Sequence, residues 1–476
     1  MRLKLSLLIL AVSALSGAQV WEKPIAPGLI YHMEIDATTP RIIHALRFSP
    51  GSPTKAMVDL AGKKVYAETA TKGRLTVSQM VAEQGAIAGI NGDFFPYTGD
   101  PLGAMVRSGE LISVPALPRA SFGWSNAEGS GTFGIMSFHG SFTANGNETA
   151  IDNVDGDCPP NGIAFNTETT GFSLCKTPNV QLTIRIAEAD FSPNGKTTGT
   201  IQAMTADEPS LAVPKGCAIL VAQGAKTGAL TSLRPGDKIT IQFRADGIDW
   251  RKVDQLIGGG PFLVKDGQIT PDSEAEHFRD DFSKQRHPRS AVGKTANGDF
   301  WFVAVDGRSP VSAGATIQEL AQVMFKLGCR DAINLDGGGS TDMNIMGVNV
   351  NRPSDGVERE LANGIFFFGP RPASPVQPAH PATIDGPATL DMAGTVTLHA
   401  MDANKAVPDA EVIWSAQGAA WIDQGGLLKP LKPGPATVTA WVHGQIVMKQ
   451  ITVTGSPRTK PTPSRSGGGR GKRGGG

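Results

Sequence analysis

Short apolar runs that end in Asn or Asp followed by glycine recur along the chain. Each run is long enough for a β-strand, and the polar residue with its glycine is ordinary turn chemistry. The runs are 86–90 before Asn91-Gly-Asp93, 253–257 before Gly258-Gly259-Gly260-Pro261, 300–305 before Asp306-Gly-Arg308, and 332–335 before Asp336-Gly337-Gly338-Gly339-Ser340-Thr341. We therefore predict strands whose carboxyl ends carry polar, glycine-rich turns.

A helix pattern separates the last two runs. Thr316-Ile-Gln-Glu319 fits a capping box, apolar residues fall on one face over 317–327, and Gly328 ends the pattern. A second short helix is predicted over 77–84. The lengths of strand, helix and strand over 300–335 favour a βαβ unit, which would bring Asp306 and Asp336 to one sheet edge. The predicted fold class of residues 19–369 is α+β, a mixed sheet with few helices.

The remainder of the chain divides into four further segments. Residues 1–18 have two positive charges, a short apolar run and small residues before a cleavage site, which predicts a signal peptide and an exported protein. Residues 370–382 form a proline-rich linker. Residues 383–455 alternate in short runs and resemble a bacterial immunoglobulin-like (Ig-like) β-sandwich, to which we assign no catalytic role. Residues 456–476 are basic and glycine-rich, which predicts a disordered, solvated tail, with contact to anionic envelope polymers as the alternative.

The composition narrows the classes of function. The 44 basic and 44 acidic residues balance, which argues against a nucleic-acid-binding protein. After the N-terminus no apolar run reaches the length of a membrane-spanning helix. Export makes a disulfide between Cys158 and Cys175 plausible chemistry, because they bracket a loop-like stretch. Cys217 and Cys329 are either buried thiols or a second bridge.

The polar turns supply the candidate chemistry. Two carboxylates flanking one bond are what glycoside cleavage usually needs, and Asp306 and Asp336 are the pair that the predicted topology brings together. The amides of 337–339 would form a concavity for an anion, and Ser340 and Thr341 would add hydroxyl donors. Arg289, in His287-Pro-Arg-Ser, is suited to bind phosphate. Glu319 is a helix cap and a further candidate catalytic acid.

Together these stretches resemble the phosphodiester glycosidase family. The matching pieces are Ala88-Gly-Ile-Asn-Gly-Asp-Phe-Phe95, Ile257-Gly-Gly-Gly-Pro-Phe-Leu-Val-Lys-Asp-Gly267, Pro288-Arg-Ser-Ala-Val-Gly293, Val305-Asp-Gly-Arg308, Gly314-Ala-Thr-Ile-Gln-Glu-Leu-Ala321 and Asn334-Leu-Asp-Gly-Gly-Gly-Ser-Thr341. They follow the family's order and cover about residues 28–369. The last piece is the specific one.

The resemblance implies hydrolysis of a sugar-1-phosphodiester, or a phosphorylated glycan, at the anomeric carbon–oxygen bond. For this reaction we assign Arg289 and the 337–339 amides to the phosphate, and Asp306 and Asp336 as nucleophile or stabiliser and as acid/base, in an order that the sequence does not fix. Asn91, Asn334 and Thr341 are the candidates for binding the sugar hydroxyls. The remaining predicted substrate-binding residues are Asp93, Gly259, Gly260, Arg308 and Ser340.

Two alternatives stay open. One is a non-catalytic envelope protein that binds a phosphorylated glycan. The other is a metal-dependent phosphoesterase in which Asp93, Asp306 and Asp336 share a divalent cation. Apart from that cation, the sequence predicts no cofactor.

Overall fold

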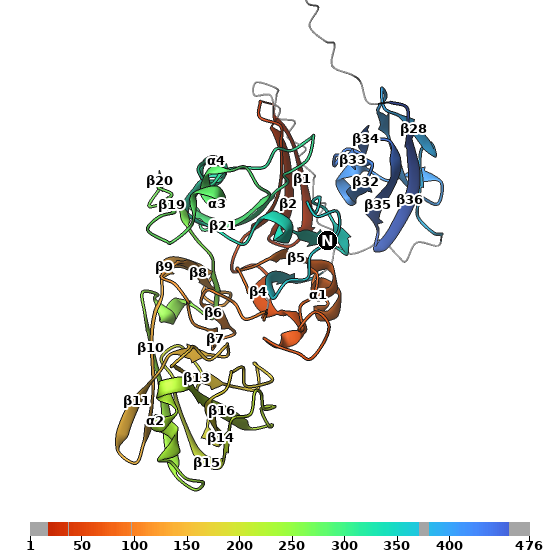
Figure 1. Ribbon diagram of the computed structural model, residues 1–476. Helices are drawn as coiled ribbons and strands as arrows, with labels where there is room; N and C mark the ends of the chain where they lie inside the picture. The colour runs from red at the N-terminus through yellow and green to blue at the C-terminus, as the bar shows by residue number, and fades with distance from the viewer. Residues whose placement is uncertain (1–17, 37, 97, 371–379, 457–476) are drawn as a thin grey trace, which may run out of the picture.

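The computed structural model describes residues 18–36, 38–96, 98–370 and 380–456 (Figure 1). The predicted signal peptide, most of the predicted linker and the basic tail lie outside these residues. About 48% of the described residues are strand and 10% are helix, arranged in many sheets that approach a barrel. The fold is therefore mostly β, and the predicted α+β class is wrong. Within the described ranges, no helix combines the length and apolarity needed to cross a membrane.

The first sheet has eight strands in the order β1-β2-β3-β22-β21-β23-β19-β20. Their bounds are Ala18–Ala26 (β1), Leu29–Asp36 (β2), Arg41–Phe48 (β3), Phe262–Lys265 (β19), Gln268–Ile269 (β20), Arg289–Thr295 (β21), Phe300–Val305 (β22) and Cys329–Asn334 (β23). Both faces of the central strands are covered. In β22, Phe300, Phe302 and Ala304 join one core and Trp301, Val303 and Val305 join another. This two-sided burial explains why the run is apolar at every position.

Helix α4 (Ile317–Lys326) covers one face of this sheet. The predicted capping box is confirmed, because Thr316 accepts the Glu319 amide and Glu319 accepts the Thr316 amide. However, β22 and β23 are not neighbours. Strand β21 lies between them and pairs antiparallel with each, so the predicted unit of adjacent parallel strands does not form. Because both are antiparallel to β21, β22 and β23 still point the same way.

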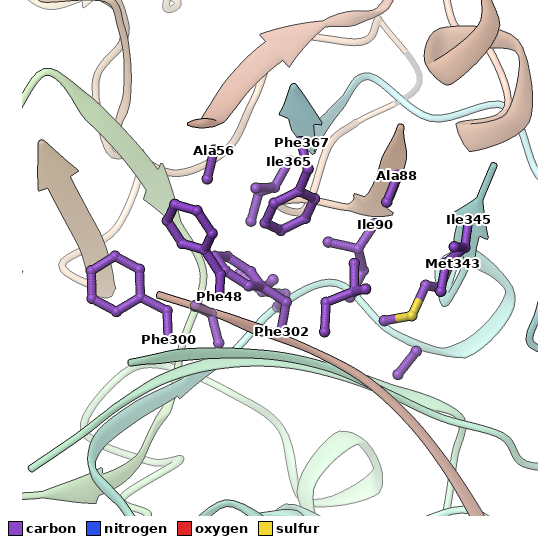
Figure 2. Close-up of a cluster of buried hydrophobic side chains, with 14 of the residues drawn as sticks. Phe48, Ala56, Ala88, Ile90, Phe300, Phe302, Met343, Ile345, Ile365 and Phe367 are labelled. Atoms are coloured by element: carbon purple, nitrogen blue, oxygen red, sulfur yellow. The ribbon is translucent and has the colours of Figure 1, made fainter. Parts of the chain in front are cut away.

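The second sheet has the order β25-β24-β5-β26-β4 and packs on the other face. Its strands are Lys55–Leu60 (β4), Ala88–Asn91 (β5), Met343–Ile345 (β24), Val348–Asn349 (β25) and Asn363–Phe368 (β26). Figure 2 shows the core between the sheets, where Phe48 and Phe302 of the first face Ile90 and Phe367 of the second. Helix α1 (Val77–Gln84), predicted from the sequence, covers the outer side of this second sheet.

Residues 105–258 form a third sheet, which shares side chains such as Phe122 and Trp124 with the main core, and a fourth sheet at the bottom of Figure 1. The third sheet has the order β7-β6-β18-β8-β9, and its strands are Met105–Arg107 (β6), Glu110–Ser113 (β7), Ala120–Ser125 (β8), Ser130–Ile135 (β9) and Gln255–Gly258 (β18). The fourth has the order β11-β10-β17-β15-β14-β16-β13-β12, and its strands are Ser137–Ala144 (β10), Asn147–Ile151 (β11), Asn153–Val154 (β12), Ile163–Asn166 (β13), Asn179–Glu188 (β14), Lys196–Ala206 (β15), Cys217–Gln223 (β16) and Lys238–Asp246 (β17). Strand β18 belongs to the third sheet and delivers the Gly258–Gly260 turn to the centre of the molecule.

Residues 383–454 form three small sheets around their own core, drawn in blue in Figure 1. The strands are Thr383–Asp385 (β27), Thr389–Asp391 (β28), Val396–Thr397 (β29), His399–Asp402 (β30), Lys405–Ala406 (β31), Val412–Gly418 (β32), Ala420–Ile422 (β33), Leu427–Pro430 (β34), Gly434–Val442 (β35) and Gln445–Thr454 (β36). We call this part the C-terminal β unit. The Ig-like resemblance stays a prediction.

The remaining helices are short. They are Ala61–Lys63 (η1), Gly224–Lys226 (η2), Gly228–Thr231 (α2), Trp250–Lys252 (η3), Asp280–Lys284 (α3), Gly338–Ser340 (η4) and Asp409–Glu411 (η5).

Candidate functional site

Three segments meet at one edge of the first sheet: the start of β21 and the residues that follow β22 and β23. Arg289 pairs with Val305, and Ala291 pairs with Asn334, so Arg289, Asp306 and Asp336 belong to the same edge. Their side chains do not all point the same way, because residues alternate between the faces of a strand. Asp306 continues the face of Ala304, which belongs to the core between the sheets, whereas Arg289 continues the face of Ala291, which packs under α4.

A cavity of about 540 Å³ opens at this edge. Six of the predicted residues line it: Arg289, Arg308, Asp336, Gly337, Gly338 and Gly339. The other lining residues are Phe94, Leu102, Arg119, His277, Phe278, Arg279, Asp281, Phe282, Gln285, His287 and Arg359. A second hollow of the same volume lies beside β19 and β20, but it has one lysine and no arginine. Of the two hollows, the one at the sheet edge is lined by six of the predicted site residues and the other by none.

Arg289 is the deepest cation of the cavity wall, with 1% of its surface exposed. Its Nε donates to Ala315 O at 2.9 Å, its Nη2 donates to Phe282 O and Gln285 O, and its guanidinium lies 4.7 Å from the Phe282 ring centre. Among the described residues no carboxylate pairs with it. Burial lowers the pKa of Arg289 to about 10. Because its hydrogen-bond partners are neutral carbonyls, the positive charge of Arg289 is not neutralised and can attract a bound anion.

Asp336 is the predicted catalytic carboxyl group on the cavity wall; the wall also carries Asp281, which pairs with Arg279. Its Oδ1 accepts the Gly337 amide at 2.8 Å, and burial raises its pKa to about 6. Asp93 lies behind it, 3% exposed, and accepts the amides of Phe94 and Gly103 at 2.7 and 2.6 Å. Burial raises the pKa of Asp93 to about 7, and the negative charge of Asp336 adds to that rise. The two carboxyls are thus electrostatically coupled, and only Asp336 reaches the cavity.

An aromatic wall completes the cavity. Phe278 and Phe282 stack with ring centres 4.8 Å apart, and Phe94 packs against both. Arg119 lies 4.0 Å from the centre of the Phe278 ring, and its Nε donates to Glu276 O. The cavity therefore combines an apolar surface with several guanidinium groups, a combination that suits an anion joined to a ring or other apolar body.

The glycine turn contributes less hydrogen bonding to the cavity than its sequence suggests. The Gly337 amide donates to Asp336 Oδ1, and the Gly338 amide donates to Pro288 O at 2.9 Å. The Gly337 amide is therefore occupied within the turn and the Gly338 amide by the residue before β21, so these two amides do not form the phosphate cradle that the sequence predicts.

Asp306 faces away from the cavity. Its Oδ1 accepts the Arg352 amide at 2.9 Å, and its Oδ2 lies 3.7 Å from His44 Nε2. His44 Nδ1 in turn lies 2.7 Å from the Tyr31 hydroxyl, and Asp306 and His44 are both at most 2% exposed. The predicted pairing of Asp306 with Asp336 across one bond therefore does not match the geometry.

Most other predicted residues lie behind the cavity and hold the turns in place. Glu319 caps α4 and pairs with Arg286 and Arg41. Asn91 Nδ2 donates to Asp336 O at 2.7 Å, and Asn334 Nδ2 donates to Gly260 O at 2.9 Å. Ser340 Oγ accepts from Arg359, Thr341 Oγ1 contacts Ser290 Oγ at 3.4 Å, and a Cβ on Gly259 would lie 2.4 Å from Asn334 O.

The structure describes Cys158 and Cys175 as free thiols, so the predicted disulfide is not present. The two residues belong to one small apolar cluster, but their sulfurs contact different carbonyls. Cys158 Sγ lies 3.4 Å from Gly162 O, and Cys175 Sγ lies 3.5 Å from Pro209 O. Cys217 and Cys329 are buried thiols.

The metal alternative needs Asp93, Asp306 and Asp336 around one ion. Across the part of the chain that the structure describes, no three His, Cys, Asp or Glu side chains gather as a metal site requires. Asp306 and Asp336 face opposite sides of the sheet edge, so these three carboxylates do not form such a set.

Sequence reasoning missed Arg119, Arg359, Phe278 and Phe282. They lie on loops and a short helix without a recurring motif. Phe278 and Phe282 lie four positions apart in a charged stretch. This spacing is the one sequence signal that could have indicated a local aromatic pair.

Comparisons with known proteins find relatives in sequence and in fold. Residues 186–368 match the family model described as phosphodiester glycosidase. An uncharacterized protein of the SPbeta prophage of Bacillus subtilis (strain 168), YomE, is 38% identical over 85 residues, 18% of this chain and 13% of that protein. The bovine N-acetylglucosamine-1-phosphodiester alpha-N-acetylglucosaminidase is 28% identical over 148 residues, 28% of each chain.

A crystal structure of a hypothetical protein from Synechocystis shares the fold, with a TM-score of 0.61, 22% identity, and coverage of 72% of this chain and 62% of that one. The matches span less than a third of either curated relative named above. The matched family region includes Arg289, Arg308, Asp336 and Arg359.

Proposed function

Residues 186–368 carry a phosphodiester glycosidase domain, and from this premise we propose that the protein hydrolyses a sugar-1-phosphodiester, such as an N-acetylglucosamine-1-phosphodiester. The bond cleaved is the anomeric carbon–oxygen bond, and the products are the free sugar and a phosphomonoester. The observation that carries the proposal is the cavity wall shared by Arg289, a buried cation that has no carboxylate partner among the described residues, and Asp336, a carboxyl with a raised pKa.

The leaving group explains why Asp336 can serve without a second catalytic carboxylate, since Asp281, the other carboxyl group on the wall, pairs with Arg279. A phosphomonoester leaves readily, so it needs charge neutralisation more than it needs a general acid. Arg289 and Arg308 line the cavity and supply positive charge for that purpose. Arg308 also lies beside His287, with 3.2 Å between Nη2 and Nδ1.

Asp336 then acts at the anomeric carbon. Its pKa of about 6 leaves it mostly ionised at neutral pH, so it can stabilise an oxocarbenium-like centre or attack it as the anomeric carbon–oxygen bond breaks and the phosphomonoester leaves. Water then adds to the anomeric carbon, releases Asp336 where it has bonded, and gives the free sugar, with the water's proton passing to solvent or to the phosphate. Asp93 does not touch the cavity, and we assign it a positioning role. It holds the Gly103 and Phe94 amides behind Asp336, and a Cβ on Gly103 would lie 2.4 Å from Asp93 Oδ2. The close approach requires glycine at that position.

The test is a panel of sugar-1-phosphodiesters incubated with the purified full-length chain. We expect free sugar and phosphomonoester in equal amounts, and a loss of turnover of at least roughly a hundredfold in Asp336→Asn. Asp157→Asn is a matched control, because Asp157 is also a carboxyl with a raised pKa but lies outside the cavity. Release of inorganic phosphate, or an Asp336→Asn variant as fast as wild type, would contradict the assignment.

One observation favours a second candidate, an envelope protein that binds a phosphorylated glycan without cleaving it. The stacked Phe278 and Phe282 with Arg119 would bind a sugar ring and its phosphate whether or not chemistry follows. Saturable binding of the same panel without any product would favour this function. In either case we propose that residues 1–18 direct export, which cell fractionation tests.

A further inference from the structure

The C-terminal β unit is docked against the main body of the protein. Lys23 of β1 is 2% exposed, and its Nζ donates to Val412 O at 2.5 Å and Gln424 O at 2.7 Å. Ile413 and Trp421 of the unit belong to the same apolar core as the two main sheets. The C-terminal β unit therefore shares an apolar core with the part of the protein that carries the cavity.

The docked unit holds one particular segment, residues 349–360, which connects β25 to β26. Four hydrogen bonds join them. Ser415 Oγ donates to Asn349 O at 2.5 Å, and Gln417 Nε2 donates to Asn351 O at 3.1 Å. Arg352 donates in the other direction, from Nη1 to Ala420 O at 3.1 Å and from Nη2 to Gly418 O at 2.6 Å. All four bonds satisfy backbone carbonyls, so they fix the path of the chain as well as its side chains.

The far end of the 349–360 segment forms part of the cavity. Arg359 lines the cavity, pairs with Asp355 at 2.6 Å, and donates to Ser340 Oγ at 3.3 Å. This ion pair lies directly on the glycine turn, because a Cβ on Gly339 would be 2.1 Å from both Arg359 Nη2 and Asp355 Oδ2. The positive charge of Arg359 also opposes the rise in the pKa of Asp336.

Asp306 holds the Arg352 end of the segment from the main body. Its Oδ1 accepts the Arg352 amide, next to the side chain that reaches the C-terminal unit. The segment is thus fixed at Arg352 from two sides, by Asp306 of the main body and by carbonyls of the C-terminal unit. A change at either anchor should move Arg359 relative to Asp336.

We propose that the C-terminal β unit is a positioning element of the cavity: through Ser415, Gln417 and Arg352 it holds the 349–360 segment so that Arg359 lies over the glycine turn. Substrate affinity therefore depends on residues of the unit that never touch substrate. The statement about substrate rests on the proposed function, whereas the statement about the segment does not.

The test compares three full-length variants. Ser415→Ala/Gln417→Leu removes two of the bonds from the unit side, and Arg352→Met removes the other two. Thr437→Val is the control, because Thr437 Oγ1 bonds only to Gln450 within the unit, at 3.1 Å, on an exposed surface. Hydrogen exchange of amides 349–360 is measured together with KM and kcat on the sugar-1-phosphodiester that wild type cleaves.

We expect faster exchange in 349–360 and a roughly five- to twentyfold rise in KM in both test variants, with kcat within about threefold of wild type. The Thr437→Val control should match wild type in every measurement. Exchange and KM equal to the control in both test variants would overturn the proposal.

If wild type cleaves no member of the panel, the proposed function fails but this proposal remains testable. Binding of inorganic phosphate, measured by calorimetry, then replaces KM. Faster exchange with weaker phosphate binding in the test variants supports the proposal, and unchanged exchange with unchanged phosphate binding rejects it.

Discussion

Replacing Asp336 by asparagine should stabilise the protein while abolishing its turnover. The pKa of Asp336 is raised from 3.8 to about 6, chiefly by burial. A carboxyl whose folded-state pKa lies above its unfolded value binds its proton more tightly in the folded state. Ionisation therefore favours unfolding, and stability falls as the pH rises from about 4 to 6. Above pH 6 the whole penalty is present, and below pH 4 it is absent.

The size of the effect follows from the shift. About two pKa units correspond to about 3 kcal/mol at roughly 1.4 kcal/mol each. Asp336 is partly exposed on the cavity wall, so water screens part of this penalty, and we expect a net gain of about 1–2 kcal/mol for Asp336→Asn at pH 8. The asparagine oxygen can still accept the Gly337 amide, so this hydrogen bond is kept.

The assay is urea unfolding of wild type and Asp336→Asn at pH 8 and pH 4, with turnover measured on the same preparations. The gain should be present at pH 8 and disappear at pH 4. Asp155→Asn is the control, because Asp155 is buried with a pKa of about 6 but accepts three hydrogen bonds from Thr167 and Thr170. It should lose stability and keep turnover. An Asp336→Asn variant that is less stable at pH 8 and fully active would refute the reasoning.

Three further predictions concern groups outside the cavity. Asp306→Ala leaves the Arg352 amide without its acceptor, so urea unfolding should show a loss of about 1–3 kcal/mol with kcat within about tenfold of wild type; a hundredfold loss of kcat would return Asp306 to the chemistry. Burial lowers the pKa of Lys23 to about 7, so the free energy of unfolding of wild type should rise between pH 7 and 10, and Lys23→Met should flatten that rise. Equal slopes of unfolding free energy against pH in the two proteins, measured by urea unfolding, would contradict this. Burial raises the pKa of Cys158 to about 12 and of Cys175 to about 11, so these thiols in native protein at pH 8 should react slowly with iodoacetamide. Protein that is unfolded without reduction should gain four adducts by mass spectrometry, one for each free thiol, whereas two adducts would show a disulfide.

The local elements could be predicted from sequence because their causes are local. The Thr316 capping box and the apolar face of α4 lie within a dozen residues, and the structure has that helix at Ile317–Lys326. The runs before Asn91, Asp306 and Asp336 are strands for the same reason. Sheet order is different, since the insertion of β21 between β22 and β23 depends on pairing between distant segments.

The direction of Asp306 could have been deduced from alternation. In 300–305, even-numbered residues face the core between the sheets and odd-numbered residues face α4, so Asp306 continues the inward face. By the same alternation, Arg289 in β21 and Asp336 after β23 continue the face that packs under α4, opposite to the face of Asp306. Arg359 could not be placed in this way, because its position depends on a segment held by the C-terminal β unit more than 50 residues later in the chain.

The three glycines after Asp336 lie beside the cavity, but the reason that glycine is needed there differs from the predicted one. The prediction was that they free backbone amides for a phosphate, but Gly337 donates to Asp336 and Gly338 donates to Pro288. At Gly339 the constraint is space, since any side chain would collide with the Arg359–Asp355 ion pair. Gly339→Ala should therefore act on binding by displacing Arg359, and it should resemble Arg352→Met in raising KM more than it lowers kcat. A loss confined to kcat in Gly339→Ala would mean that the turn acts directly on the reacting bond.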